Sequence, residues 1–198
     1  RSPYRTVITH GWTLDKDGKA MSKSMGNVIS PQEIIKTNGA EILRLWVAMV
    51  NYREDMRLSR EVIKRVIETY RKIRNTWRFM FGVLGDFEPE NHLVNPGSLR
   101  EVDRYVLARM ETIKEKILTA YRDYEYHVVF HTISNFFTNE LSAFYLNFTK
   151  DFLYCHATGD PARRGIQTVV FQVLRDTLLL LAPILSFTAE EGWEYLPG

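Results

Sequence analysis

Residues 59–83 read Ser-Arg-Glu-Val-Ile-Lys-Arg-Val-Ile-Glu-Thr-Tyr-Arg-Lys-Ile-Arg-Asn-Thr-Trp-Arg-Phe-Met-Phe-Gly-Val, and this stretch decides the fold. Its apolar side chains recur every three or four residues, which is the spacing of a helix with one face turned to a core. Ser59 is a favourable residue for capping the start of such a helix. We therefore predict a long helix over 59–83 that buries one side: Ile63, Val66, Tyr70, Ile73 and Trp77.

The same spacing continues through most of the chain. It predicts further helices over about 99–121, 127–150 and 162–182, and a short one that begins near Ser186 or Thr188. Turn residues separate them, among them the run from His156 to Pro161. We expect an aromatic stripe in the third helix to pack in the core: Phe136, Phe137, Phe144 and Phe148. The prediction is a mainly α protein with an antiparallel helical bundle.

The first fifty residues have a different pattern. Residues 5–14 are rich in β-branched and aromatic types and predict a strand, with Gly11 as a bulge. Ser30-Pro31-Gln32-Glu33 has the spacing of a capping box with proline in the first turn. A small α/β unit over residues 1–52 is thus expected before a helical domain over residues 53–198.

Composition limits the possibilities further. The 198 residues are 45% hydrophobic and 25% charged, with a net charge of +2, as in ordinary globular domains. A single cysteine, Cys155, excludes an internal disulfide and fits a reducing compartment; we expect it to be buried or half-buried. No run of 18 apolar residues occurs, so we expect no membrane span. We also expect a cytoplasmic location and a monomer.

Residues 17–27, Asp-Gly-Lys-Ala-Met-Ser-Lys-Ser-Met-Gly-Asn, form a short polar segment between glycines. Its small residues allow backbone N–H groups to approach an anion, and Lys23 adds a compact positive charge on a flexible stem. The segment predicts a loop that handles phosphate groups. A solvated surface turn is the alternative.

Basic residues gather on one side of the 59–83 helix. At about 100° per residue, five of them fall within an arc of roughly 80°. A one-sided basic stripe predicts a site for a polyanion such as RNA, although many basic faces are only solvated, and Arg74 and Arg78 could instead pair with Glu54 or Asp55. The predicted RNA-binding residues are Arg60, Lys64, Arg71, Arg74 and Arg78.

The histidines give little support for a metal site. His127 and His131 have helical spacing, but no third ligand accompanies them, so capping or surface roles are expected. His10, close to the loop, could contact a nucleotide or serve only at a strand end.

Several segments carry a family resemblance. Met21-Ser-Lys-Ser24, with Gly26-Asn-Val directly after it, resembles the signature loop of class I aminoacyl-tRNA synthetases. Gly39-Ala-Glu-Ile-Leu-Arg-Leu-Trp46 resembles the segment next to that loop in the isoleucine, valine and leucine enzymes. Within that group, residues 70–79, 141–146 and 182–191 are similar to the bacterial isoleucyl-tRNA synthetase family.

The resemblance implies roles for the loop. Lys23 would be the catalytic lysine that stabilises the leaving pyrophosphate, and Met21, Ser22, Lys23 and Ser24 would bind ATP with its Mg²⁺. The first lysine of the family signature is Ala20 here, and Lys19, one place earlier, is the candidate to replace it.

The resemblance also implies that the chain is a fragment. The family's His-x-Gly-His signature, its editing domain and its zinc module have no counterpart in the sequence, so no zinc site is expected. We expect a part of isoleucine–tRNA ligase, acting on isoleucine, ATP and tRNA(Ile), that makes no aminoacyl-tRNA alone. Alternatives are a stand-alone tRNA-binding module, a valyl-tRNA synthetase fragment and a helical protein-interaction domain.

Overall fold

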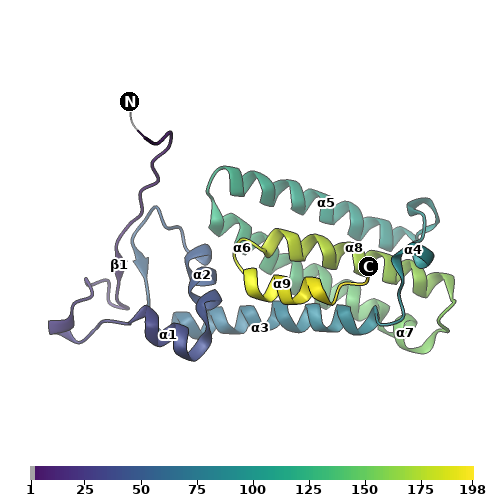
Figure 1. Ribbon diagram of the computed structural model, residues 1–198, viewed down its shortest axis with the longest axis horizontal. Coiled ribbons are helices and arrows are strands. Elements are labelled where there is room, and N and C mark those ends of the chain that lie inside the picture. The colour runs from purple at the N-terminus through teal and green to yellow at the C-terminus, as the bar shows by residue number, and fades with distance from the viewer. Residues whose placement is uncertain (1–2) are drawn as a thin grey trace.

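The computed structural model describes residues 3–198 as a small N-terminal α/β unit beside a long helical bundle (Figure 1). The N-terminal unit contains β1 (Thr13–Leu14), η1 (Lys23–Met25), α1 (Pro31–Asn38), α2 (Ala40–Met49) and β2 (Met56–Arg57). The bundle contains α3 (Arg60–Val83), α4 (Pro89–His92), η2 (Pro96–Ser98), α5 (Glu101–Arg122), α6 (Tyr126–Asn135), η3 (Phe136–Leu146), α7 (Asn147–Cys155), α8 (Pro161–Leu181) and α9 (Ser186–Glu194). The prediction of a mainly α fold with a small α/β unit is confirmed.

The bundle forms where the sequence spacing predicts it. Ser59 caps α3 by accepting a hydrogen bond from the Val62 N–H at 3.2 Å, and Asp160 caps α8. The α8 helix runs through the centre of the core, against α3, α5, α7 and α9. Fourteen of its 21 residues are buried, which explains why apolar side chains occur on more than one of its faces.

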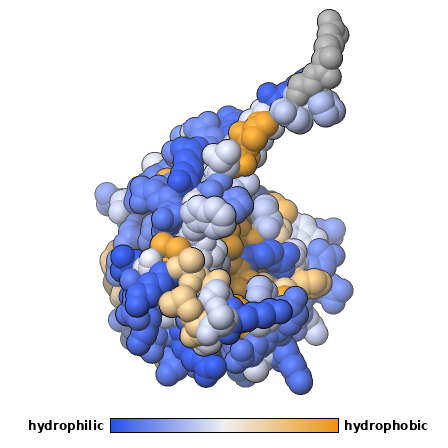
Figure 2. All heavy atoms as spheres, turned by 90° about the vertical axis from the view of Figure 1, so that its left-hand side faces the viewer, coloured by the Kyte–Doolittle hydropathy of each residue, from blue (hydrophilic) through white to orange (hydrophobic). Residues whose placement is uncertain are grey.

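The predicted strand over residues 5–14 is wrong for most of its length. Only Thr13–Leu14 forms a strand, paired in parallel with Met56–Arg57. The pairing stops there because the partner strand β2 is only two residues long. The residues before it are exposed, including Val7 and Trp12, and apolar side chains lie on the segment that projects from the body (Figure 2). Gly11 is not a bulge: a Cβ there would lie 2.1 Å from the Glu54 carbonyl oxygen.

The predicted capping box at the start of α1 is also wrong. Pro31 does begin the helix, but the Ser30 hydroxyl donates to Gln32 at 2.7 Å and makes no cap. The Glu33 carboxylate lies 3.3 Å from Arg60 in α3. The Glu33 carboxylate is therefore paired with Arg60 and not with the backbone N–H of Ser30.

The third predicted helix contains a π-helical segment, η3, between α6 and α7. Because π turns are wider than α turns, each residue advances by a smaller angle and the aromatic stripe leaves one face. Phe136 and Phe137 are buried as expected, but Phe144 and Phe148 are exposed and stack on each other at 6.4 Å. Core packing was therefore the wrong prediction for those two. The thiol of Cys155, at the end of α7, is likewise exposed.

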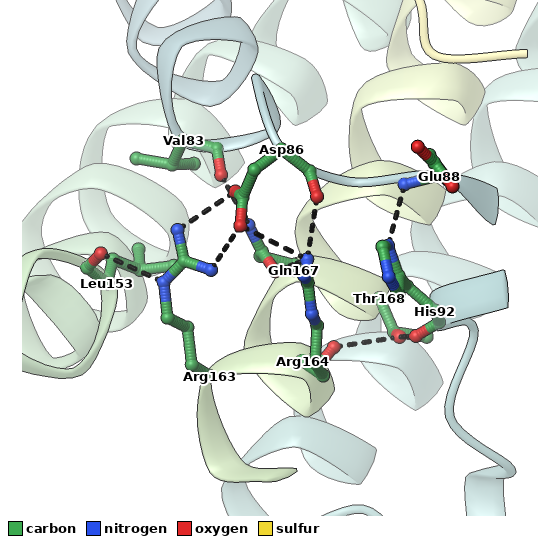
Figure 3. A network of polar contacts seen from close by, with 9 residues as sticks. All are labelled: Val83, Asp86, Glu88, His92, Leu153, Arg163, Arg164, Gln167 and Thr168. Carbon is green, nitrogen blue, oxygen red and sulfur yellow. Dashed lines mark hydrogen bonds and ion pairs between the residues drawn. The ribbon is translucent and has the colours of Figure 1, made fainter. Parts of the chain in front are cut away.

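A polar network ties the end of α3 to the start of α8 (Figure 3). The Arg163 guanidinium donates to both carboxylate oxygens of Asp86, at 2.6 and 2.9 Å. Gln167 donates to the Val83 carbonyl and to Asp86, both at 2.8 Å, and Arg164 donates to the Asp86 carbonyl at 2.9 Å. The Arg163 pair holds the pKa of Asp86 down at about 2.

Candidate functional site: the lysine loop and the α3–α9 pocket

The loop over residues 15–27 is a hairpin-like turn at the end of the molecule remote from the bundle (Figure 1). The Asp15 N–H donates to the Lys19 carbonyl at 2.9 Å and the Gly18 N–H donates to the Asp15 carbonyl at 3.1 Å. Gly18 has φ +76°, a conformation that glycine adopts without steric cost. Residues 15–18 therefore form a tight turn at the start of the loop.

Asn27 holds the two sides of the loop together. Its amide donates to Asp15 at 2.8 Å and to the Ala20 carbonyl at 3.1 Å, and its oxygen accepts from the Ser22 N–H at 2.9 Å. Hydrogen bonding from Asn27, and then from the Lys19 N–H, lowers the pKa of Asp15. Asp15 and Asn27 therefore support the loop, a role that the sequence reasoning did not assign to them.

Lys23 begins the short 3₁₀ turn η1 at the tip of the loop. The Ser22 hydroxyl accepts from the Met25 N–H at 3.3 Å, and Gly26 ends the turn in the left-handed region at φ +65°. Among residues 3–198, neither Lys23 nor Lys19 makes an ion pair, and both side chains are exposed. The geometry leaves both ammonium groups accessible to an anion, while Met21 is half-buried.

All five residues of the predicted basic stripe are exposed on α3, but they have different surroundings. Arg60 lies 3.3 Å from Glu33, and Arg71 lies 2.9 Å from Glu68. Within the described part of the chain, Lys64, Arg74 and Arg78 form no ion pair. The alternative pairing with the connector is not observed, because Asp55 accepts from the Trp12 N–H and Glu54 from Asn51.

Arg74 and Arg78 lie at a pocket of about 410 Å³ between α3 and α9. The α3 helix contributes two aromatic side chains, and α9 contributes a carboxylate and a hydroxyl, with a tyrosine directly after it. Beside the arginines, the lining residues are Asn75, Trp77, Phe81, Thr188, Glu191, Gly192 and Tyr195. The pocket thus joins two cations, one carboxylate and aromatic surface, which is a combination suited to an unstacked nucleotide.

The α9 wall is held by contacts that the sequence did not predict. Glu41, from α2, accepts from the N–H groups of Phe187 and Thr188 at 2.8 and 3.1 Å. The Thr188 hydroxyl lies 2.9 Å from the Tyr70 hydroxyl on α3. A Cβ on Gly192 would lie 2.7 Å from a Leu178 methyl group, so glycine permits the close approach of α9 to α8. The conformation of this wall therefore depends on three helices.

The other sites considered from sequence show no catalytic constellation. The His10 ring lies against the Gly11 carbonyl at 2.8 Å, at the edge of β1. Residues 3–198 contain no group of three His, Cys, Asp or Glu side chains placed to hold a metal ion. No helix among them is both long and apolar enough to cross a membrane.

Two family sequence models match the chain. The model of the class I tRNA synthetases (I, L, M and V) matches residues 1–59, and that of the anticodon-binding domain of tRNA ligase matches residues 103–198. The isoleucine–tRNA ligase of Syntrophotalea carbinolica is 48% identical to this chain over 197 residues, and that of Geobacillus kaustophilus is 48% identical over 198 residues. The isoleucine–tRNA ligase of Desulforudis audaxviator is 49% identical over 196 residues. The chain is similar to class I tRNA synthetases along its whole length.

The 48–49% identities to isoleucine–tRNA ligases confirm the resemblance that the sequence motifs indicated. The matches cover 99–100% of the chain but 21% of each relative, so the chain spans about a fifth of their length. The lysine loop (residues 15–27) lies within the match to the synthetase model, and α9 lies within the match to the anticodon-binding model.

Solved synthetases share the fold. LeuRS of Agrobacterium radiobacter K84, solved with tRNA and LeuAMS, aligns with a TM-score of 0.73 at 17% identity, over 96% of this chain and 22% of that one. Methionyl-tRNA synthetase of Mycobacterium tuberculosis with methionyl-adenylate aligns at 0.76 and 21% identity, over 93% of this chain and 36% of its own. The arrangement of the small α/β unit and the bundle is therefore that of known synthetases.

Proposed function

We propose that this chain is the segment of an isoleucine–tRNA ligase that contributes the ATP-binding loop and the tRNA-binding helices. The observation that carries the proposal is the 48% identity to such ligases over the whole chain, loop and bundle together. The full enzyme would join isoleucine to ATP with release of pyrophosphate, and then transfer the isoleucyl group from the adenylate to tRNA(Ile). Residues 1–52 would complete the catalytic domain, with β2 (Met56–Arg57) of the connector paired to its strand β1, and the helices within residues 53–198 would form the tRNA-binding domain.

Lys23 would act on the first step. As the bond between the α- and β-phosphates of ATP breaks, negative charge grows on the departing pyrophosphate, and a nearby ammonium group favours that state. Its exposed position at the tip of the Asn27-supported turn fits this role, with Lys19, Met21, Ser22 and Ser24 beside it. As the family resemblance implies, Mg²⁺ would arrive on the triphosphate, and zinc would be held by other parts of the enzyme.

The α3 helix would act on tRNA. Lys64, Arg74 and Arg78, which make no internal ion pair in the described residues, would contact backbone phosphates, with weaker contributions from Arg60 and Arg71. The α3–α9 pocket would hold an unstacked base against Trp77 or Phe81. Both roles would be performed in the cytoplasm, by an enzyme predicted to be a monomer.

The salt dependence of tRNA(Ile) binding tests this assignment. In the ligase that contains this chain, replacing both Arg74 and Arg78 by Gln should weaken binding by about a hundredfold or more, since each charge-assisted hydrogen bond contributes about 1.5–3 kcal/mol. The slope of log K against log salt should fall by about 0.7 for each lost phosphate contact. Lys36→Gln on α1, which also removes one exposed charge, is the control. Unchanged affinity and slope in the double variant would exclude α3 as the tRNA-binding face.

A further inference from the structure

A second polar groove lies between α5 and α6, and none of its lining residues belongs to α3 or α9. It has a volume of about 430 Å³. Basic and hydroxyl side chains dominate its lining, with a single carboxylate at one end. The groove is lined by Arg109, Thr112, Ile113, Lys116, His127, Val128, His131, Thr132, Asn135 and Glu140.

The carboxylate in this groove is already neutralised. Glu140 accepts from Nε and Nη2 of Arg109 at 2.7 and 3.0 Å. This pair leaves Nη1 of Arg109 without a partner among the described residues. Lys116 likewise has no ion pair in residues 3–198. Counting only lysine, arginine and carboxylate side chains, the lining has a formal charge of +1, because the charges of Arg109 and Glu140 cancel and that of Lys116 remains.

His127 supplies an unused polar atom. Its Nδ1 is buried and has no hydrogen-bond partner among residues 3–198. A buried polar atom without a partner is destabilising, so a ligand that reaches it after the imidazole ring turns toward the groove gains binding energy there. His131 lies one helical turn further along α6, on the same side of the helix. A metal is not the expected occupant, because no third ligand is placed to hold one.

We propose that this α5–α6 groove binds the phosphate group of a phosphate ester. Donors from both helices line it, and a tetrahedral oxyanion has enough oxygens to accept from several of them, whereas a carboxylate has two. The volume exceeds that of one phosphate group, so a sugar or nucleoside attached to it would fit beside Thr112, Thr132 and Asn135. The ester is either the backbone of an RNA or a free nucleotide.

Proton–carbon NMR of the His127 and His131 rings, titrated with inorganic phosphate, tests the proposal. The ring signals should shift and saturate, and Lys116→Gln should weaken the apparent affinity by about tenfold, as expected for loss of one charge-assisted hydrogen bond. Lys36→Gln, outside the groove, should leave the affinity unchanged. Shifts that never saturate, or that are the same in Lys116→Gln and in the wild type, would overturn the proposal.

Two further titrations identify the source of the phosphate. Single-stranded oligouridylate and adenosine monophosphate are each added to the phosphate-saturated chain while the His131 signal is followed. Displacement by the RNA at lower concentration assigns the groove to an RNA backbone, and displacement by the nucleotide at lower concentration assigns it to a free nucleotide. Failure of both to displace phosphate would contradict a phosphate-ester site.

Discussion

Glu41 in α2 accepts a hydrogen bond from the backbone N–H of Thr188, at 3.1 Å, across 147 positions of the sequence. The same carboxylate accepts from the Phe187 N–H and from the Thr188 hydroxyl. It therefore caps α9 in place of a residue from α9 itself, which has no side-chain cap. Because Thr188 lines the α3–α9 pocket, the N-terminal unit fixes one wall of the proposed tRNA site.

Replacing Glu41 by Ala should destabilise the protein and impair RNA binding. The substitution leaves the first N–H groups of α9 without partners at a largely buried site, so the free energy of unfolding should fall by about 1–3 kcal/mol. Urea unfolding measures the loss. Glu190→Ala, an exposed carboxylate on α9 with no such contacts, is the matched control and should change stability by less than about 0.5 kcal/mol.

Asp86 should make stability dependent on pH in the acid range. Its pKa is about 2 in the folded protein against an ordinary value of 3.8, so its contribution is fully present above about pH 4 and is lost as the pH falls toward 2. At pH 6, Asp86→Asn should lower the free energy of unfolding by about 1–3 kcal/mol because Arg163 loses its charged partner. The difference between the two proteins should shrink as the pH falls toward about 2, and a constant difference would contradict the assigned role.

Gly192→Ala should disturb the pocket from inside. The new Cβ would meet Leu178 at 2.7 Å and Phe81 at 3.4 Å, which displaces α9 and should cost about 1–3 kcal/mol. Gly82→Ala, in the last turn of α3, meets nothing within 4 Å and should be neutral or stabilising. Thermal unfolding compares the two variants, and equal melting temperatures would show that α9 is not tightly packed here.

Asn27→Ala should loosen the lysine loop without affecting the bundle. It removes three hydrogen bonds, to Asp15, Ala20 and Ser22, while the bundle keeps all of its contacts. In the full ligase we expect isoleucine-dependent exchange between ATP and pyrophosphate to fall about tenfold or more, with tRNA affinity within about twofold of the wild type. Parallel losses in both measurements would indicate a wider structural role for Asn27.

The helical bundle was predictable because each helix carries its own periodic signal. Ser59, the α8 run and the turn at 156–161 show their local preference in the sequence and keep it in the fold. The exceptions arise where geometry departs from an ideal helix. The π turns of η3 change the side of the helix that Phe144 faces, and also the side that Phe148 faces in α7 directly after it. No local sequence pattern predicts that change.

The site was predictable only in part. Sequence reasoning named Lys23 and the arginines of α3, since charge and spacing along a single segment are visible in a chain. It missed Glu191, Tyr195 and the cap by Glu41, because these meet α3 only through folding. It also placed a strand over residues 5–14, where β propensity without a long partner strand is insufficient.

Lys23→Ala in the full ligase provides the most direct test of the central claim that this chain joins an ATP-handling loop to a tRNA-binding bundle. The measurement is isoleucine-dependent exchange between ATP and pyrophosphate, with tRNA(Ile) affinity determined on the same preparation. We predict that exchange falls by about 10²–10³, as for loss of one electrostatic contact in the transition state, while tRNA affinity stays within about twofold of the wild type. Exchange at the wild-type rate would contradict the account.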